Sequence, residues 1–186
     1  MEITAQIFGI IAMLCFILSF QFKKGSLIIF CQLIGTVFYS LQYAFLSVIN
    51  HTVYMGLLMN VIGIFRAWVY YKREFFHAEH VFWTVFFIAT FIICYVLLFT
   101  CFNVQANATN LILEALPAVG NIITTVAFKN KDAKIIRAFS LASCVPWGTY
   151  HFTHASIGGT IGEIFNFLST LIGIIRHDVK KSKDED

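Results

Sequence analysis

The sequence predicts an all-α membrane protein with seven transmembrane helices, arranged as two three-helix repeats joined by one inversion helix (3+1+3). Three observations lead to this expectation. Of the 186 residues, 59% are hydrophobic and 12% are charged, which does not suit a water-soluble domain. Charged residues occur in short clusters, and the apolar stretches between them approach the roughly 20 residues that a helix needs to cross a bilayer. Short matches between the first and last parts of the chain indicate a repeat.

The expected helices follow from these apolar stretches, and we treat residues 1–186 as a single transmembrane domain. Only Met1 and Glu2 precede the first stretch, so it lacks the basic region of a cleavable signal peptide and is expected to be retained. A first triple-helix repeat is predicted over 3–71, a linker helix over 81–102, a second repeat over 111–175 and a cytoplasmic tail over 176–186. The seven helices are predicted at 3–22, 27–46, 53–71, 81–102, 111–128, 135–152 and 157–175.

The positions of Lys and Arg predict the orientation, because cytoplasmic loops carry an excess of both. Basic clusters follow the first, third, fifth and seventh segments, at Lys23, Lys24, Lys72, Arg73, Lys129, Lys131, Lys134, Arg137, Arg176, Lys180, Lys181 and Lys183. The segments 47–52, 103–110 and 153–156 contain neither residue. We therefore expect a multi-pass protein of the cell (inner or plasma) membrane, with its N-terminus outside and its C-terminus in the cytoplasm. Arg66 lies inside a span, where its long side chain is expected to reach the cytoplasmic interface.

The repeat is read from short matches. Phe22-Lys23 corresponds to Phe128-Lys129, and Gly56-Leu-Leu-Met-Asn60 corresponds to Gly162-Glu-Ile-Phe-Asn166, each 106 residues later. Three helices reverse the direction of the chain, so two units of like orientation need one further helix between them. The aromatic segment 81–102 is expected to be that helix. Parallel repeats of this kind place a solute site on their axis, near the middle of the membrane.

Polar residues inside the spans are the candidates for that site. Asn60 and Asn166 occupy matching places, and an opposed pair of amides suits a neutral hydroxyl- or amide-bearing solute better than an ion. Trp147 follows Pro146, which is expected to kink the helix, and Ser40 has nearly the equivalent place in the first repeat. An indole opposite a small hydroxyl would form a stacking wall. Helix–helix hydrogen bonding is the alternative for the Asn pair, and ordinary packing is the alternative for Trp147.

Two carboxyl groups also lie within spans. Glu114 and Glu163 are each expected about one turn from the outer end, where either partial exposure to water or a role in a proton-coupled step would explain them. Gln42 and Asn121 extend the polar set and are further candidates for the pathway.

Several other functions are not expected. The five cysteines form no C-x-x-C pair, and His151 and His154 lack a third ligand, so no metal site is predicted. No catalytic motif occurs, so we predict neither an enzyme nor a cofactor. The expected partners are the lipid bilayer and a small solute, and not nucleic acid.

Particular motifs resemble a known family. Gln21-Phe-Lys-Lys-Gly-Ser26, Gln32, Tyr43-Ala-Phe-Leu46 and the stretch from Asn60 to Arg66 resemble the YgjV family of bacterial inner-membrane proteins, and the likeness covers most of the chain. More distantly, the 3+1+3 plan is similar to that of the SWEET and PQ-loop transporters.

The more distant likeness implies particular roles. An Asn on the third helix of each repeat and an aromatic residue on a second helix would line a sugar site, and these roles would fall to Asn60, Asn166 and Trp147, with Ser40 opposite. The Pro-Gln pair of those transporters is replaced here by Phe20-Gln21.

Two hypotheses for function follow. The first is a transporter that moves a small neutral polar solute, similar to a sugar or a vitamin, by alternating access. The second is a membrane scaffold or receptor that transports nothing, in which the same Asn residues only fasten helices together.

Overall fold

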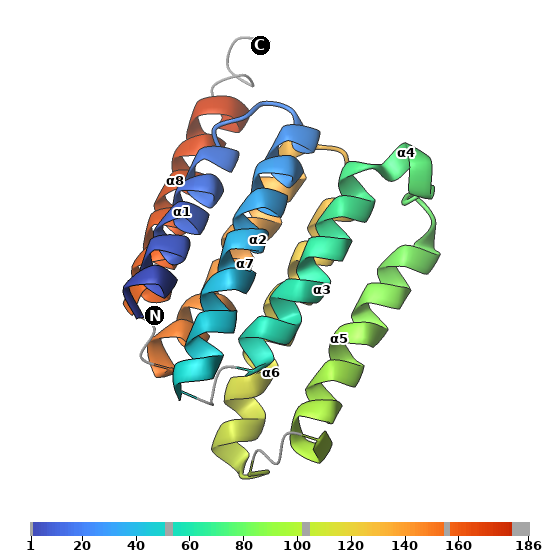
Figure 1. The fold of residues 1–186 in the computed structure, drawn as a ribbon. Helices are drawn as coiled ribbons and strands as arrows, with labels where there is room; N and C mark the ends of the chain where they lie inside the picture. Colours follow the sequence, from blue (N-terminus) through green and yellow to red (C-terminus); the bar gives the residue numbers. More distant parts are fainter. Residues whose placement is uncertain (1, 51–53, 102–104, 155–156, 180–186) are drawn as a thin grey trace.

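The computed structural model of the protein describes residues 2–50, 54–101, 105–154 and 157–179, and all regular structure in these residues is helical (Figure 1). A short helix, α4 (Arg73–Phe76), and a π-helical turn, η1 (Ile175–Val179), accompany the long helices. The long helices are α1 (Glu2–Ser19), α2 (Gly25–Asn50), α3 (Tyr54–Tyr71), α5 (Val81–Cys101), α6 (Ala108–Lys129), α7 (Ala133–Thr153) and α8 (Ile157–Ile174).

Each predicted helical segment lies on one of these long helices, with ends that differ by a few residues. The sequence reading missed α4, which the left-handed backbone of His77 terminates (φ 49°), and it missed η1. Both are single turns without the periodic pattern of a longer helix, so they leave little signal in a sequence. Val53, Phe102 and residues 180–186, which belong to the predicted third helix, fourth helix and tail, lie outside the described residues.

The packing of the helices forms a ring of six. Helix α1 packs on α2 and α2 on α3, while α6 packs on α7 and α7 on α8 (Figure 1). Contacts of α1 with α8 and of α3 with α6 close the ring. Helix α5 lies against α3 and α6, on the outside of the ring. The first and the last long helix, α1 and α8, therefore lie side by side, although they are far apart in sequence.

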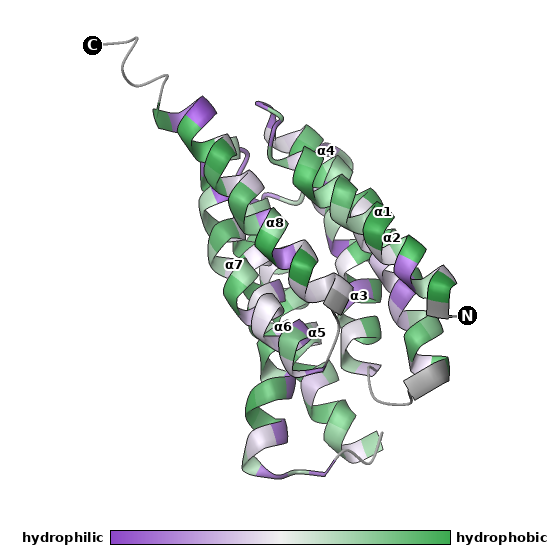
Figure 2. Cartoon of the chain, turned by 90° about the vertical axis from the view of Figure 1, so that its left-hand side faces the viewer, coloured by the Kyte–Doolittle hydropathy of each residue, from purple (hydrophilic) through white to green (hydrophobic). Residues whose placement is uncertain are grey.

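The surface of the bundle is apolar, unlike that of a water-soluble protein. Large apolar side chains point away from the bundle, with Ile3 78%, Ile164 57% and Val96 52% exposed, and hydrophobic residues predominate along α8 and α7 in Figure 2. Beside an apolar core, buried positions also hold many polar groups, including Gln32 and Asn121. Apolar surface this extensive is stable only in an apolar surrounding, and buried polar groups in a membrane protein face the interior of its bundle.

Among the described residues, four helical segments are long and apolar enough to cross a membrane: Gly25–Val48, Val81–Cys101, Ala108–Lys129 and Gly158–Val179. Ile3–Ser19 is a shorter apolar helix. Helices α3 and α7 fall outside this group because Asn60 and Arg66 in the first, and Lys134 and Arg137 in the second, lower their mean hydropathy. Polar residues on these two helices thus weaken the signal of a span, and two of them, Asn60 and Arg66, also line the interior of the ring.

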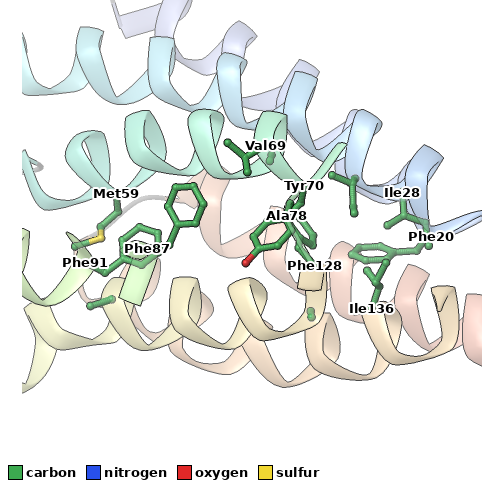
Figure 3. Close-up of a cluster of buried hydrophobic side chains, with 14 of the residues drawn as sticks. Phe20, Ile28, Met59, Val69, Tyr70, Ala78, Phe87, Phe91, Phe128 and Ile136 are labelled. Carbon is green, nitrogen blue, oxygen red and sulfur yellow. The ribbon is translucent and has the colours of Figure 1, made fainter. Parts of the chain in front are cut away.

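The apolar core lies largely between α5 and the ring. Phe87 and Phe91 of α5 pack near Met59 of α3, and Tyr70 lies against Phe128 of α6 with ring centroids 6.4 Å apart (Figure 3). The hydroxyls of Tyr70 and Thr84 share a hydrogen bond of 3.1 Å, which joins α3 to α5. Close packing fixes α5 to the outside of the ring, and the polar interior is left to the other six long helices.

Candidate functional site

A small cavity with polar and aromatic lining residues lies inside the ring of six helices, with a volume of about 60 Å³. Every helix of the ring contributes to its lining. One lining residue from each, in the order α1, α2, α3, α6, α7 and α8, is Phe16, Tyr39, Asn60, Asn121, Trp147 and Asn166. Helices from the first and last parts of the chain thus build one site together.

The structure brings together most of the residues that the sequence singled out. Asn60, Asn166, Trp147, Asn121 and Glu163 all line the cavity. Asn60 and Asn166 of the two third helices and Trp147 of a second helix therefore lie on one common surface.

Three further candidates lie elsewhere. Ser40 is not among the lining residues, and its hydroxyl donates to the carbonyl of Thr36 within α2 at 2.9 Å. Gln42 is buried against α1, where a Cβ added to Gly9 would lie 2.6 Å from its amide nitrogen. Glu114 pairs with His154 at 3.0 Å.

The two matched asparagines are bonded within their own helices. The amide of Asn60 donates to the carbonyl of Gly56 at 2.8 Å, and the amide of Asn166 donates to the carboxyl of Glu163 at 3.4 Å. The side-chain oxygen of Asn166 is buried and has no hydrogen-bond partner among the described residues. A buried acceptor without a partner costs about 1–3 kcal/mol, so this oxygen is suited to receive a hydrogen bond from a ligand.

Arg66 is the main functional candidate that sequence reasoning missed. The prediction that its side chain reaches the cytoplasmic interface is wrong. Arg66 lies buried with 5% of its surface exposed, and it lines the cavity. Its Nη1 donates to the backbone and side-chain oxygens of Asn121, at 2.8 and 2.7 Å, and to the hydroxyl of Thr125 at 3.3 Å. The guanidinium also lies over the rings of Phe91 and Phe128, at 5.6 and 5.2 Å. A charge inside a span was the available signal, because such a residue is a functional candidate by default.

Aromatic rings close the cavity toward the ends of α2 and α7. The Tyr43 hydroxyl and His151 Nδ1 lie 2.7 Å apart and join these two helices across the ring. His151 stacks on Trp147 with centroids 5.6 Å apart. Trp147 in turn fills the space beside Gly120, where an added Cβ would lie 2.6 Å from the indole. Trp147 is therefore a wall of the cavity, supported from behind by α6.

The other end of the bundle carries the basic clusters, and we call it the basic end. Arg137 of α7 binds both carboxyl oxygens of Asp178 and donates to the carbonyl of Phe22 at 3.0 Å. Arg73 donates to the carbonyls of Phe128 and Asn130, at 3.0 and 3.2 Å. Phe22 and Phe128 are the matched residues of the repeat, so an arginine from another part of the chain binds the backbone at each of these two places.

The remaining titratable groups fit no metal site. Glu114 is buried, not exposed to water, and one of its oxygens lacks a hydrogen-bond partner among the described residues. His151 and His154 bind different partners, Tyr43 and Glu114. Within the part of the chain that the structure describes, no group of three or more metal-ligating side chains occurs.

Comparison with known proteins supports one family. The sequence model of the Imp-YgjV family, described as a bacterial inner membrane protein, matches residues 3–181. No curated protein and no solved structure matches the chain.

Proposed function

Because the chain belongs to the Imp-YgjV family of bacterial inner membrane proteins, we propose that it is a carrier for a small polar solute without net charge, working by alternating access. The cavity supports this proposal most directly. Six helices contribute polar or aromatic side chains to one buried space, and Asn166 presents an unsatisfied acceptor there. A protein that only needed stability would gain by filling such a space with apolar side chains.

The proposed architecture is seven spans in the 3+1+3 plan. The packing of α5 outside the ring supports its role as the linker between a unit of α1–α3 and a unit of α6–α8. The basic loops that follow α1, α3 and α6 are neighbours, since Arg73 binds the carbonyl of Phe128 and a Cβ on Gly25 would lie 2.5 Å from the carbonyl of Lys131. One shared basic side supports a cytoplasmic basic end, with the N-terminus outside.

Alternating access would require both ends of the cavity to open in turn. A volume of about 60 Å³ is far below the several hundred Å³ of a typical ligand pocket, so the described conformation is closed. The Tyr43–His151 contact closes one end, and the contacts of Arg137 and Arg73 hold the basic end. These are the contacts that we expect to break in the two open states.

The alternative is a scaffold or receptor in which the asparagines fasten helices together. The hydrogen bonds of Asn60 and Asn166 favour the carrier instead, because both stay within one helix and neither joins two helices. Replacing either residue by Leu should therefore leave thermal stability within about 1 kcal/mol, whereas a scaffold should lose more.

Uptake into proteoliposomes tests the proposal. Purified full-length protein is reconstituted, and the entry of labelled sugars, nucleosides, vitamins and amino acids is followed. A solute should enter at least tenfold faster than in vesicles carrying the double variant Asn60→Ala, Asn166→Ala. Thr90→Ala is a matched control, because Thr90 is exposed on α5 and bonds only within its own helix. The carrier proposal is wrong if no solute distinguishes the wild type from the double variant.

A further inference from the structure

The cavity contains a positive charge without a negative partner. Each ion pair between described residues joins other groups, namely Lys131 with Glu79, Arg137 with Asp178 and His154 with Glu114. The three hydrogen bonds of Arg66 all leave from Nη1 and go to uncharged oxygens, and its buried Nε has no partner among the described residues. An isolated buried charge is strongly disfavoured even after relaxation, and neutral acceptors and two aromatic rings offset this cost only in part.

The same cavity contains a carboxyl group without a cation. Glu163 of α8 lines it, and its carboxyl accepts hydrogen bonds from the amide of Asn166 and from the thiol of Cys144, neither of which carries a positive charge. Arg66 and Glu163 belong to different halves of the chain and to helices on different sides of the ring. No salt bridge of 4 Å or less joins them.

Further unsatisfied groups surround this pair of charges. Four buried side-chain atoms without a partner among the described residues belong to residues that line the cavity: Tyr39 Oη, Arg66 Nε, Ser140 Oγ and Asn166 Oδ1. Buried polar groups are normally satisfied, so several such atoms around one space indicate a missing ligand or water. The space of about 60 Å³ is several times the roughly 10–15 Å³ that suffices for one water molecule.

We infer that the cavity binds a small zwitterion, whose carboxylate pairs with Arg66 and whose ammonium group pairs with Glu163. This inference rests on the proposed carrier function and names the class of its solute. A zwitterion supplies one opposite charge to each group and leaves the site with no net change of charge. A sugar would leave both charges unpaired, and a simple anion would leave Glu163 unpaired.

The geometry of each group suits its proposed partner. The planar guanidinium of Arg66 has free N–H groups beyond Nη1, and two parallel N–H groups match the two oxygens of a carboxylate. Tyr39 and Trp147 line the cavity together with Glu163, and aromatic faces attract an ammonium group. The volume limits the ligand of the closed state to the smallest members of the class.

Four probes of similar size and different charge test the inference: glycine (zwitterion), glycolate (anion), glycinamide (cation) and glycolamide (neutral). Thermal stabilisation of the purified full-length protein reports binding, and uptake into proteoliposomes reports transport. We expect glycine to bind at least tenfold more tightly than each of the other three. Equal stabilisation by all four probes, or stabilisation by glycolamide alone, would overturn the inference.

Two substitutions should change the preference in opposite directions. Glu163→Gln should favour glycolate over glycine by at least tenfold, and Arg66→Gln should favour glycinamide. A loss of folding cannot produce these reciprocal changes, since each variant gains a ligand as it loses one. Arg66→Lys keeps the charge and should retain the preference for glycine. An unchanged order of the four probes in both Gln variants would contradict the site.

Transport and binding separate this inference from the carrier proposal. Entry of glycolamide or a sugar without entry or binding of glycine would support the carrier proposal and contradict the inference of a zwitterionic solute. Binding of glycine with the expected changes of ligand preference in the two Gln variants, but without uptake of any solute, would support the zwitterion site and contradict the carrier proposal. If no solute is taken up and glycine does not bind, the zwitterion site and the carrier proposal are both wrong.

Discussion

The two halves of the ring share a frame and differ in charge. Gly56 and Asn60 in α3 correspond to Gly162 and Asn166 in α8, 106 residues later. At the same offset, however, Glu163 stands against an apolar Leu57 in the first half. The asparagines provide like groups on two sides of the cavity, whereas the carboxyl comes from one side only.

The positive charge shows the opposite asymmetry. Arg66 lines the cavity from the first half, and the residue 106 positions later is Ile172, which is 55% exposed on the apolar outer surface. A perfectly repeated site would present two like charges to its own axis, and these would repel each other. The asparagines of the site are therefore repeated in the two halves, while its charged residues, Arg66 and Glu163, are opposite in sign. Such an arrangement suits a ligand with one positive and one negative group.

The largest expected loss of stability comes from a substitution that breaks the contact between the two halves at the basic end. Arg137→Ala leaves the buried Asp178 without its cation and frees the carbonyl of Phe22. Removing one partner of a buried ion pair costs about 3–5 kcal/mol, so the free energy of unfolding in detergent should fall by that amount. The double variant Arg137→Ala, Asp178→Ala should recover part of the loss. A change below about 1 kcal/mol would show that this end does not hold the halves together.

The matched glycines give the next effect and compare the halves directly. A Cβ on Gly56 would lie 2.8 Å from the ring of Tyr43, which His151 holds in place by a hydrogen bond and by stacking. A Cβ on Gly162 would lie 3.0 Å from the hydroxyl of Tyr39, which is the far end of that side chain and can move away more easily than a ring that His151 holds in place. Overpacking costs about 1–3 kcal/mol, so Gly56→Ala should destabilise the protein by that amount and Gly162→Ala by less. Thermal unfolding of the two variants side by side measures the difference, and the reverse order would contradict the described packing.

A smaller effect concerns the unmatched charge itself. Arg66→Met keeps the length of the side chain and removes the charge, and replacing a buried ionic group by an apolar one is often stabilising. In the absence of ligand, we expect the free energy of unfolding to rise by about 1 kcal/mol, while stabilisation by glycine is lost. Functional sites commonly reduce stability in this way. A marked destabilisation would mean that Arg66 serves to hold α3 to α6 and not to bind a solute.

The sequence predicted the helices well because each is a long apolar stretch bounded by charged or turn residues. It also predicted that Asn60, Asn166 and Trp147 belong together, since matching places in a repeat come to share an axis. The surroundings of Arg66 could not be predicted in the same way. Whether a long side chain reaches the interface or turns inward depends on its neighbours, and here Asn121 and Thr125 of α6 supply the acceptors.

Ser40 illustrates the opposite case. Its place in the repeat resembles that of Trp147, but the neighbouring residue of α2, Tyr39, lines the cavity instead. Repeat position locates a residue along a helix to within about one residue, and one residue turns a side chain by about 100°. The helix that contributes to the site could therefore be predicted, but not the residue.

The smallest expected change of stability concerns an exposed ion pair on the surface of the basic end. Glu79 precedes α5 and pairs with Lys131, and both side chains are largely exposed. The hydrogen bond from Lys131 and its charge hold the pKa of Glu79 below its usual value. A carboxyl with a lowered pKa in the folded state contributes stability above its unfolded pKa, about 4.3, and loses it as the pH falls through the folded pKa. Glu79→Gln should therefore lower the melting temperature slightly at pH 7, and the difference should shrink as the pH falls through the folded pKa. Because water screens an exposed pair, the shift should be the smallest of those predicted here, and a shift as large as that of Arg137→Ala would show that the basic end is held at its surface and not by its buried arginine.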